Sequence, residues 1–181
     1  MSDEEDRLFV ITGGPGSGKS TLIAGLRDAG ACVSEESGRR IIRDQTAIGG
    51  RALPSVDPLL FAEMMLAQDL QAHRIAQGSG RVVYFDRGVP DVLGYLRLTG
   101  IAVPAHMQRA ASLFRYSRTI FIAPPWPEIY RHDEERKQSL QEAERTCEAM
   151  AEIYTACGYR LVELPRAPVK ERVDFVLEAS K

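Results

Sequence analysis

The sequence has 181 residues, a formal net charge of −2 at pH 7 and a hydrophobic fraction of 44%. These values are typical of one globular domain and exclude a disordered, collagen-like or disulfide-stapled chain. We therefore expect a single domain over residues 1–181, in which residues 1–6 form an acidic, flexible N-terminus.

Charge and hydropathy also limit the kinds of partner that we expect, in particular membranes and nucleic acids. No apolar run approaches the ~20 residues that a membrane-spanning helix needs. The acidic start differs from the basic start of a secretion or transit signal. Basic and acidic residues nearly balance, with 23 against 25, unlike in most domains that bind nucleic acid. We expect a cytoplasmic protein that binds neither membranes nor nucleic acids.

Short apolar runs alternate with helical patterns along the chain. Because the runs are continuously apolar, they are typical of parallel strands buried on both faces. The alternation predicts one α/β domain. Strands are expected at residues 7–12, 31–33, 82–85, 119–122 and 160–164. Helices are expected at 20–29, from Pro58 (with Asp57 as N-cap) to about 78, and from Pro90, Pro104 and the capping box Ser139–Glu142.

The most specific motif follows the first predicted strand and opens the first predicted helix. It matches Gly-x4-Gly-Lys-Ser/Thr, the phosphate loop of nucleotide-binding proteins. In such a loop, glycines allow successive backbone N–H groups to surround a phosphate, and the helix N-terminus adds positive potential. The predicted nucleotide-binding residues are Gly13, Gly14, Pro15, Gly16, Ser17, Gly18, Lys19, Ser20 and Thr21.

Three side chains at the end of this loop are candidates for distinct contacts. We expect Lys19 to bind the β- and γ-phosphates and Ser20 to hold Mg²⁺. Thr21 is a candidate for the α-phosphate. Lys19 is expected to be an exposed loop residue, so that its truncation would leave the fold intact.

A candidate catalytic carboxylate follows the third predicted strand. Asp86 ends that strand, where ligands gather in parallel sheets, and is the candidate general base or Mg²⁺-linked carboxylate. The neighbouring Arg87 is a candidate catalytic contact to phosphate or acceptor. Asp91 is interpreted as the first-turn acid of a helix begun by Pro90.

Further candidates lie near the other strand ends. Glu36 and Arg40 are candidates for binding the acceptor, or belong to an ordinary solvated helix start. Arg131 and Arg136 are candidate catalytic residues of a lid over the phosphates, or part of an exposed salt-bridged helix. The proline-containing segment 164–169 is either a loop that flanks a purine ring or simply the end of a strand.

Two other nucleotide-binding classes fit less well. A dinucleotide fingerprint requires a third glycine where Thr21 stands. The guanine-reading Asn-Lys-x-Asp motif of regulatory GTPases is absent from the sequence.

The phosphate loop, Phe85-Asp86-Arg87-Gly88, the Tyr130-Arg131…Arg136 segment and the proline loop after the fifth strand occur in the order seen in small P-loop kinases. Over roughly residues 8–176 the chain resembles the AAA-type ATPase family that includes the ribosylnicotinamide kinase domain of NadR. It is also similar to deoxynucleoside kinases at Asp86-Arg87, although Gly88 replaces their serine. The resemblance implies a three-layer P-loop NTPase fold with helices on both faces of a five-stranded parallel sheet in the order 2-3-1-4-5, a helical lid, and ATP and Mg²⁺ as ligands.

Together these features predict an ATP-binding, Mg²⁺-dependent phosphotransferase that acts on a small metabolite. The alternative is a nucleotide-binding ATPase or GTPase that signals to a protein partner. The two hypotheses differ in one requirement, because only a phosphotransferase needs an acceptor pocket beside Asp86 and Glu36.

Overall fold

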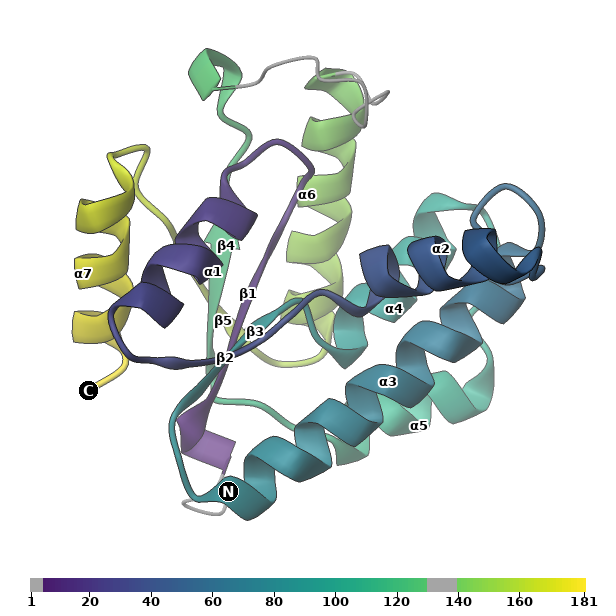
Figure 1. Ribbon diagram of the computed structural model, residues 1–181, viewed down its shortest axis with the longest axis horizontal. Helices are drawn as coiled ribbons and strands as arrows, with labels where there is room; N and C mark the ends of the chain where they lie inside the picture. Colours follow the sequence, from purple (N-terminus) through teal and green to yellow (C-terminus); the bar gives the residue numbers. More distant parts are fainter. Residues whose placement is uncertain (1–4, 130–139) are drawn as a thin grey trace.

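The computed structural model describes residues 5–129 and 140–181, in which five strands form one parallel sheet (Figure 1). The strand order is β2-β3-β1-β4-β5, as predicted. In register, Val10 of β1 lies opposite Phe85 of β3 and Ile120 of β4. The strands are β1 (Leu8–Gly13), β2 (Cys32–Ser34), β3 (Val83–Asp86), β4 (Thr119–Ala123) and β5 (Arg160–Glu163).

The three central strands are buried along their whole length, which explains their continuous apolar sequences. Because all strands run in parallel, their carboxyl ends meet at one edge of the sheet. Gly13, Asp86 and Ala123 end β1, β3 and β4 at that edge. The fold therefore brings the first predicted phosphate-loop glycine and the predicted catalytic carboxylate to the same side of the molecule.

Helices cover both faces of the sheet, as predicted (Figure 1). On one face, α1 and α7 pack on a core that includes Phe9, Leu22 and Val173. On the other face, the core includes Val10 and Tyr154 and is formed with α3, α4, α5 and α6. The helices are α1 (Lys19–Asp28), α2 (Ser37–Ile48), α3 (Pro58–Ser79), α4 (Val89–Leu98), α5 (Ala105–Leu113), α6 (Leu140–Ala156) and α7 (Val169–Ala179).

Local sequence accounts for the helix ends. The Asp57 side chain accepts a hydrogen bond from the Leu60 N–H at 3.0 Å, which caps α3 as predicted. The helix ends at Gly80, whose φ of 64° suits glycine. In the part of the chain that the structure describes, no helix has both the length and the apolar composition needed to cross a membrane.

Some predicted residues lie outside the part of the chain that the structure describes, and one helix was not predicted. The capping-box residue Ser139 and the predicted lid residues Arg131 and Arg136 lie outside the described residues, as do residues 1–4 of the predicted N-terminus. Glu5–Arg7 form a short 3₁₀ helix before β1. The helix α7 is not among the predicted helices, although its valines at 169, 173 and 176 have helical spacing.

Candidate functional site

The phosphate loop connects β1 to α1 at the carboxyl edge of the sheet. Its glycines at 16 and 18 have φ angles of 73° and 74°, in the left-handed region that favours glycine. Gly13 has a φ of 128°, and a Cβ atom there would lie 2.3 Å from the Ala123 carbonyl oxygen of β4. The local sequence therefore suits both the curvature of the loop and its close packing on the sheet.

Gly14 is equally confined, because a Cβ atom at this position would lie 2.2 Å from the Ala143 carbonyl oxygen of α6. The Ser17 hydroxyl donates to the Gly14 carbonyl at 2.8 Å and closes the loop on itself. The loop is thus held between β4 and α6 by its own glycines.

The Lys19 side chain lies over this loop. Its Nζ donates to the carbonyl oxygens of Gly13 and Gly14 at 3.1 and 2.6 Å and to the Ser17 hydroxyl at 3.3 Å. Lys19 is only 7% exposed, so the expectation of an exposed loop lysine is wrong. Burial, together with the nearby Arg87 guanidinium, lowers the pKa of Lys19 to about 8. Its position still suits a phosphate contact, since the ammonium group sits in the bend of the loop.

Asp86 ends β3 in register with Ile11 of β1 and is buried. Within the part of the chain that the structure describes, its Oδ1 atom has no hydrogen-bond partner. Burial raises the pKa of Asp86 to about 6, against the opposing effect of Lys19. A buried, unpartnered carboxylate oxygen beside a lysine is available either to take a proton or to bind a cation.

The residues present also fit a magnesium ion. Mg²⁺ prefers oxygen ligands and usually combines one or two protein oxygens with phosphates and water. The unpartnered Asp86 Oδ1 and the Ser20 hydroxyl, which is exposed at the start of α1, supply such oxygens. The predicted pair of metal ligands is therefore chemically suitable.

Arg87 connects Glu36, which precedes α2, with Asp91 in the first turn of α4. Its Nε donates to Glu36 Oε1 at 3.1 Å, and its Nη1 donates to Asp91 Oδ1 at 3.0 Å. Although burial alone would lower the pKa of Arg87, Glu36 and Asp91 raise it above its usual value. The backbone has a φ of 72°, uncommon for a residue other than glycine. Such strain persists where surrounding contacts hold it, and here the N–H also donates to the Ile11 carbonyl at 3.1 Å.

Asp91 has a larger role than a first-turn acid. As predicted, it lies in the first turn of α4, where Oδ2 accepts the Gly88 N–H at 3.0 Å. The same buried carboxylate also accepts the Thr12 hydroxyl at 2.6 Å, the Tyr154 hydroxyl at 2.6 Å and Arg87 Nη1. Asp91 thus connects the end of β1, the turn after β3, and α6. No local pattern predicts the contacts with Thr12 and Tyr154, because these partners lie 79 and 63 residues from Asp91 along the chain.

The predicted acceptor side is assembled from α2 and α3. Glu36 lies next to Arg87, and although burial opposes its ionisation, Arg87 and Lys19 lower its pKa. Asp69 of α3 is a further carboxyl group here. Burial raises its pKa to about 7 against a hydrogen bond from Ser37. Asp69 was not predicted, and its position within a long helix offers no motif that would identify it.

The predicted acceptor residue Arg40 forms its hydrogen bonds away from this cluster, with α3. Its Nε and Nη2 both donate to Gln68 Oε1 of α3, at 3.1 and 2.7 Å, and the residue is exposed. The structure therefore brings Lys19, Glu36, Asp86 and Arg87 into one electrostatic cluster, whereas Arg40 joins α2 to α3.

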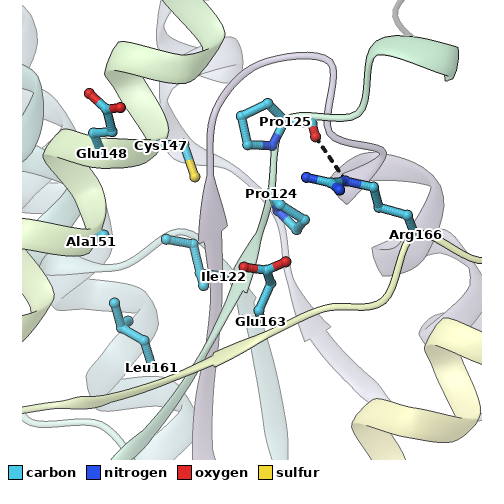
Figure 2. A pocket seen from close by; sticks show the side chains of 9 residues that line it. All are labelled: Ile122, Pro124, Pro125, Cys147, Glu148, Ala151, Leu161, Glu163 and Arg166. Atoms are coloured by element: carbon cyan, nitrogen blue, oxygen red, sulfur yellow. Dashed lines mark hydrogen bonds between the residues drawn. The ribbon is translucent and has the colours of Figure 1, made fainter.

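A cavity of about 440 Å³ lies beside the carboxyl ends of β4 and β5 (Figure 2). Cys147, Glu148 and Ala151 line it from α6. Above it, Arg166 Nε donates to the Pro125 carbonyl at 3.1 Å, which joins the loop after β4 to the predicted purine-flanking loop.

The strand order and the glycine-rich loop between β1 and α1 define a kinase-like P-loop NTPase. A family model described as an AAA domain matches residues 8–172. The chain belongs to this AAA-domain family, as the sequence resemblance predicted.

Two solved structures share the fold. NadR in complex with NR is similar with a TM-score of 0.64 and 19% identity, over 96% of this chain and 50% of the NadR chain. This chain therefore spans half the length of that protein. Thymidylate kinase from Ehrlichia chaffeensis is similar with a TM-score of 0.63 and 14% identity, over 96% of this chain and 97% of the kinase. At these identities the likeness shows the fold alone. A comparison with curated proteins gave no match.

Proposed function

We propose that this protein is an ATP-dependent, Mg²⁺-requiring phosphotransferase that acts on a small hydroxylated metabolite in the cytoplasm. The observation that supports it best is the proximity of Lys19 to Asp86 at one sheet edge, where the buried Asp86 Oδ1 has no hydrogen-bond partner among the described residues. A phosphate loop alone would serve binding, but a carboxyl group with a pKa of about 6 is suited to taking a proton near neutral pH.

Each residue has a role in this proposal. The N–H groups of the loop and Lys19 Nζ bind the phosphates of ATP, and Lys19 exchanges its bonds to the Gly13 and Gly14 carbonyls for phosphate oxygens. Mg²⁺, held by Ser20 and the phosphates, would neutralise charge on the departing group.

Transfer itself requires the removal of one proton. The acceptor oxygen forms a bond to the γ-phosphorus while the bond from that phosphorus to the β–γ bridging oxygen breaks, which releases ADP. The proton of the acceptor hydroxyl goes to Asp86 Oδ1. Arg87 is held by Glu36 and Asp91, and this arrangement favours a fixed positive charge beside the reacting groups.

Two similar solved proteins support this proposal, since one is a thymidylate kinase and the other, NadR, was solved in complex with NR. The matched family and shared fold are compatible with phosphoryl transfer. They leave the acceptor to be found by experiment.

The test is a screen of fractionated metabolites with ATP labelled on its γ-phosphate. We expect the wild-type protein to transfer label to a component of at least one fraction and the Asp86→Asn variant to lose that transfer. Hydrolysis of ATP at a rate that no fraction changes would contradict the proposal and favour the regulatory ATPase.

A further inference from the structure

Arg172 lies in the first turn of α7 and contacts the phosphate loop from outside. Its Nη1 donates to the Gly18 carbonyl at 3.3 Å, and its Nη2 donates to the Ser17 carbonyl at 3.2 Å. The residue is only 3% exposed. The ring of Trp126 covers the guanidinium group, with the Cζ atom 5.6 Å from the ring centroid. Arg172 belongs to none of the predicted motifs.

The hydrogen bonds of this guanidinium go to neutral carbonyl groups of the loop. Within residues 5–129 and 140–181, no acidic group forms an ion pair with Arg172, and its Nε has no hydrogen-bond partner. Burial lowers its pKa, as expected for a cation without a counter-charge. The positive N-terminal end of α1 is close by and is also unfavourable for a cation. An anion bound by the loop would offset both effects.

The hydrogen bonds of Arg172 constrain the direction of the loop N–H groups. A trans peptide group is planar, so its C=O and the following N–H point in opposite directions. The Ser17 carbonyl shares a peptide group with the Gly18 N–H, and the Gly18 carbonyl shares one with the Lys19 N–H. The Gly18 carbonyl also accepts the Leu22 N–H of α1 at 3.1 Å, so Arg172 and this helix together set the orientation of that peptide group. Holding the two carbonyls directs both N–H groups away from Arg172.

Gly18 is adapted to this contact. Its φ of 74° favours glycine, and a Cβ atom at this position would lie 2.6 Å from Arg172 Nη1. The last glycine of the motif thus leaves room for the guanidinium as well as for the turn into α1.

We propose that Arg172 is a positioning residue of the phosphate loop, which holds the Gly18 and Lys19 N–H groups toward a bound polyphosphate. This inference rests on the proposed nucleotide binding and adds that α7 takes part in it. Arg172 acts through the loop backbone, without contact to the nucleotide base.

The test compares Arg172→Met with wild type in equilibrium binding of two probes, MgATP and inorganic tripolyphosphate. Because each lost charge-assisted hydrogen bond leaves a loop peptide less ordered, we expect both probes to bind about 10- to 100-fold more weakly. Tripolyphosphate has no base, so a loss for MgATP with unchanged tripolyphosphate binding would overturn the proposal and place Arg172 at the base. Unchanged binding of both probes by a folded variant would overturn it as well.

The matched control is Arg27→Met on α1, where Arg27 forms an exposed ion pair with Glu35 at 2.7 Å. It should bind both probes as wild type does. Arg172→Lys keeps the charge but loses the fork that reaches two carbonyls, so its affinity for both probes should lie between wild type and Arg172→Met. If Arg172→Met does not fold, wild-type affinity in Arg172→Lys overturns the proposal.

A ligand-free measurement separates this inference from the proposed function. Amide hydrogen exchange of the peptide that contains residues 13–19 should be faster in Arg172→Met than in wild type, with exchange of β1 and β4 unchanged. Unchanged exchange in the loop would overturn the inference. Failure of wild-type protein to bind either probe would instead contradict the proposed function.

Discussion

Tyr154 of α6 donates its hydroxyl hydrogen to the buried Asp91 carboxylate at 2.6 Å. Asp91 also binds Thr12 at the end of β1 and Arg87 after β3. The hydrogen bond from Tyr154 connects α6, on one face of the sheet, to the two segments that carry the phosphate loop and the candidate base.

We expect Tyr154→Phe to lower the free energy of unfolding by about 1–3 kcal/mol, because a buried carboxylate loses one donor. Urea unfolding of both proteins measures this difference. Tyr95→Phe is the matched control, since the buried Tyr95 hydroxyl has no hydrogen-bond partner in residues 5–129 and 140–181, and its removal should leave stability unchanged or raise it. Equal losses in the two variants would contradict the role of the Asp91 bond.

Replacing Lys19 by alanine should weaken ATP binding by about 2–4 kcal/mol, because a buried cation that contacts the phosphates is lost. Calorimetric titration of the folded variant with MgATP provides the measurement. Lys170→Ala is a suitable control, as that side chain is 85% exposed on α7 and pairs with Asp174. Wild-type affinity in Lys19→Ala would refute the phosphate-loop assignment.

Asp86→Asn preserves the shape of the side chain but removes its charge and basicity. If Asp86 is the general base, transfer or hydrolysis should slow by about 10²–10⁴-fold while MgATP affinity stays nearly the same. If Asp86 holds Mg²⁺, affinity for MgATP should fall and affinity for metal-free ATP should not. Turnover and Mg²⁺ dependence identical to wild type would show that Asp86 is outside the chemistry.

The shifted pKa values of Asp86 and Lys19 predict how kcat/KM depends on pH. Activity should rise as Asp86 loses its proton near pH 6 and fall as Lys19 loses its charge near pH 8. The result is a bell-shaped profile for the free protein, after correction for ionisation of the nucleotide. Because Asp69 titrates at about 7, Asp69→Asn is the informative comparison. It should keep the acidic limb near pH 6, and loss of that limb would transfer its assignment to Asp69.

ATP should bind at least as tightly as GTP, since the sequence has no Asn-Lys-x-Asp motif to read guanine. Competition between the two nucleotides for one fluorescent ATP analogue measures the preference. A clear preference for GTP would reject this prediction and favour the regulatory alternative.

The sheet and the phosphate loop were predictable because local sequence determines both. Continuous apolar runs mark buried parallel strands, and the spacing of Gly13, Gly18 and Lys19 follows from the path of the loop backbone. The order of the strands came from the family resemblance, and the structure confirms it.

The contacts around the site were not predictable in the same way. Thr12 and Tyr154 lie 79 and 63 residues from Asp91, and Arg172 lies 154 residues from Gly18. No local pattern connects such pairs, and only the completed fold brings them together. The burial of Lys19 was missed for a related reason, because it depends on carbonyl groups that the folded loop turns toward its side chain.

Because the first two loop glycines are closely packed, their presence in a related sequence does not by itself indicate nucleotide binding. Any side chain at Gly13 or Gly14 would collide with the backbone of β4 or α6, whether or not a nucleotide is bound. A homologue that no longer binds nucleotides would therefore still need both glycines. Ser20, which is exposed at the start of α1, would be free to change, so in a distant homologue this position, more than the glycines, would indicate whether nucleotide binding is retained.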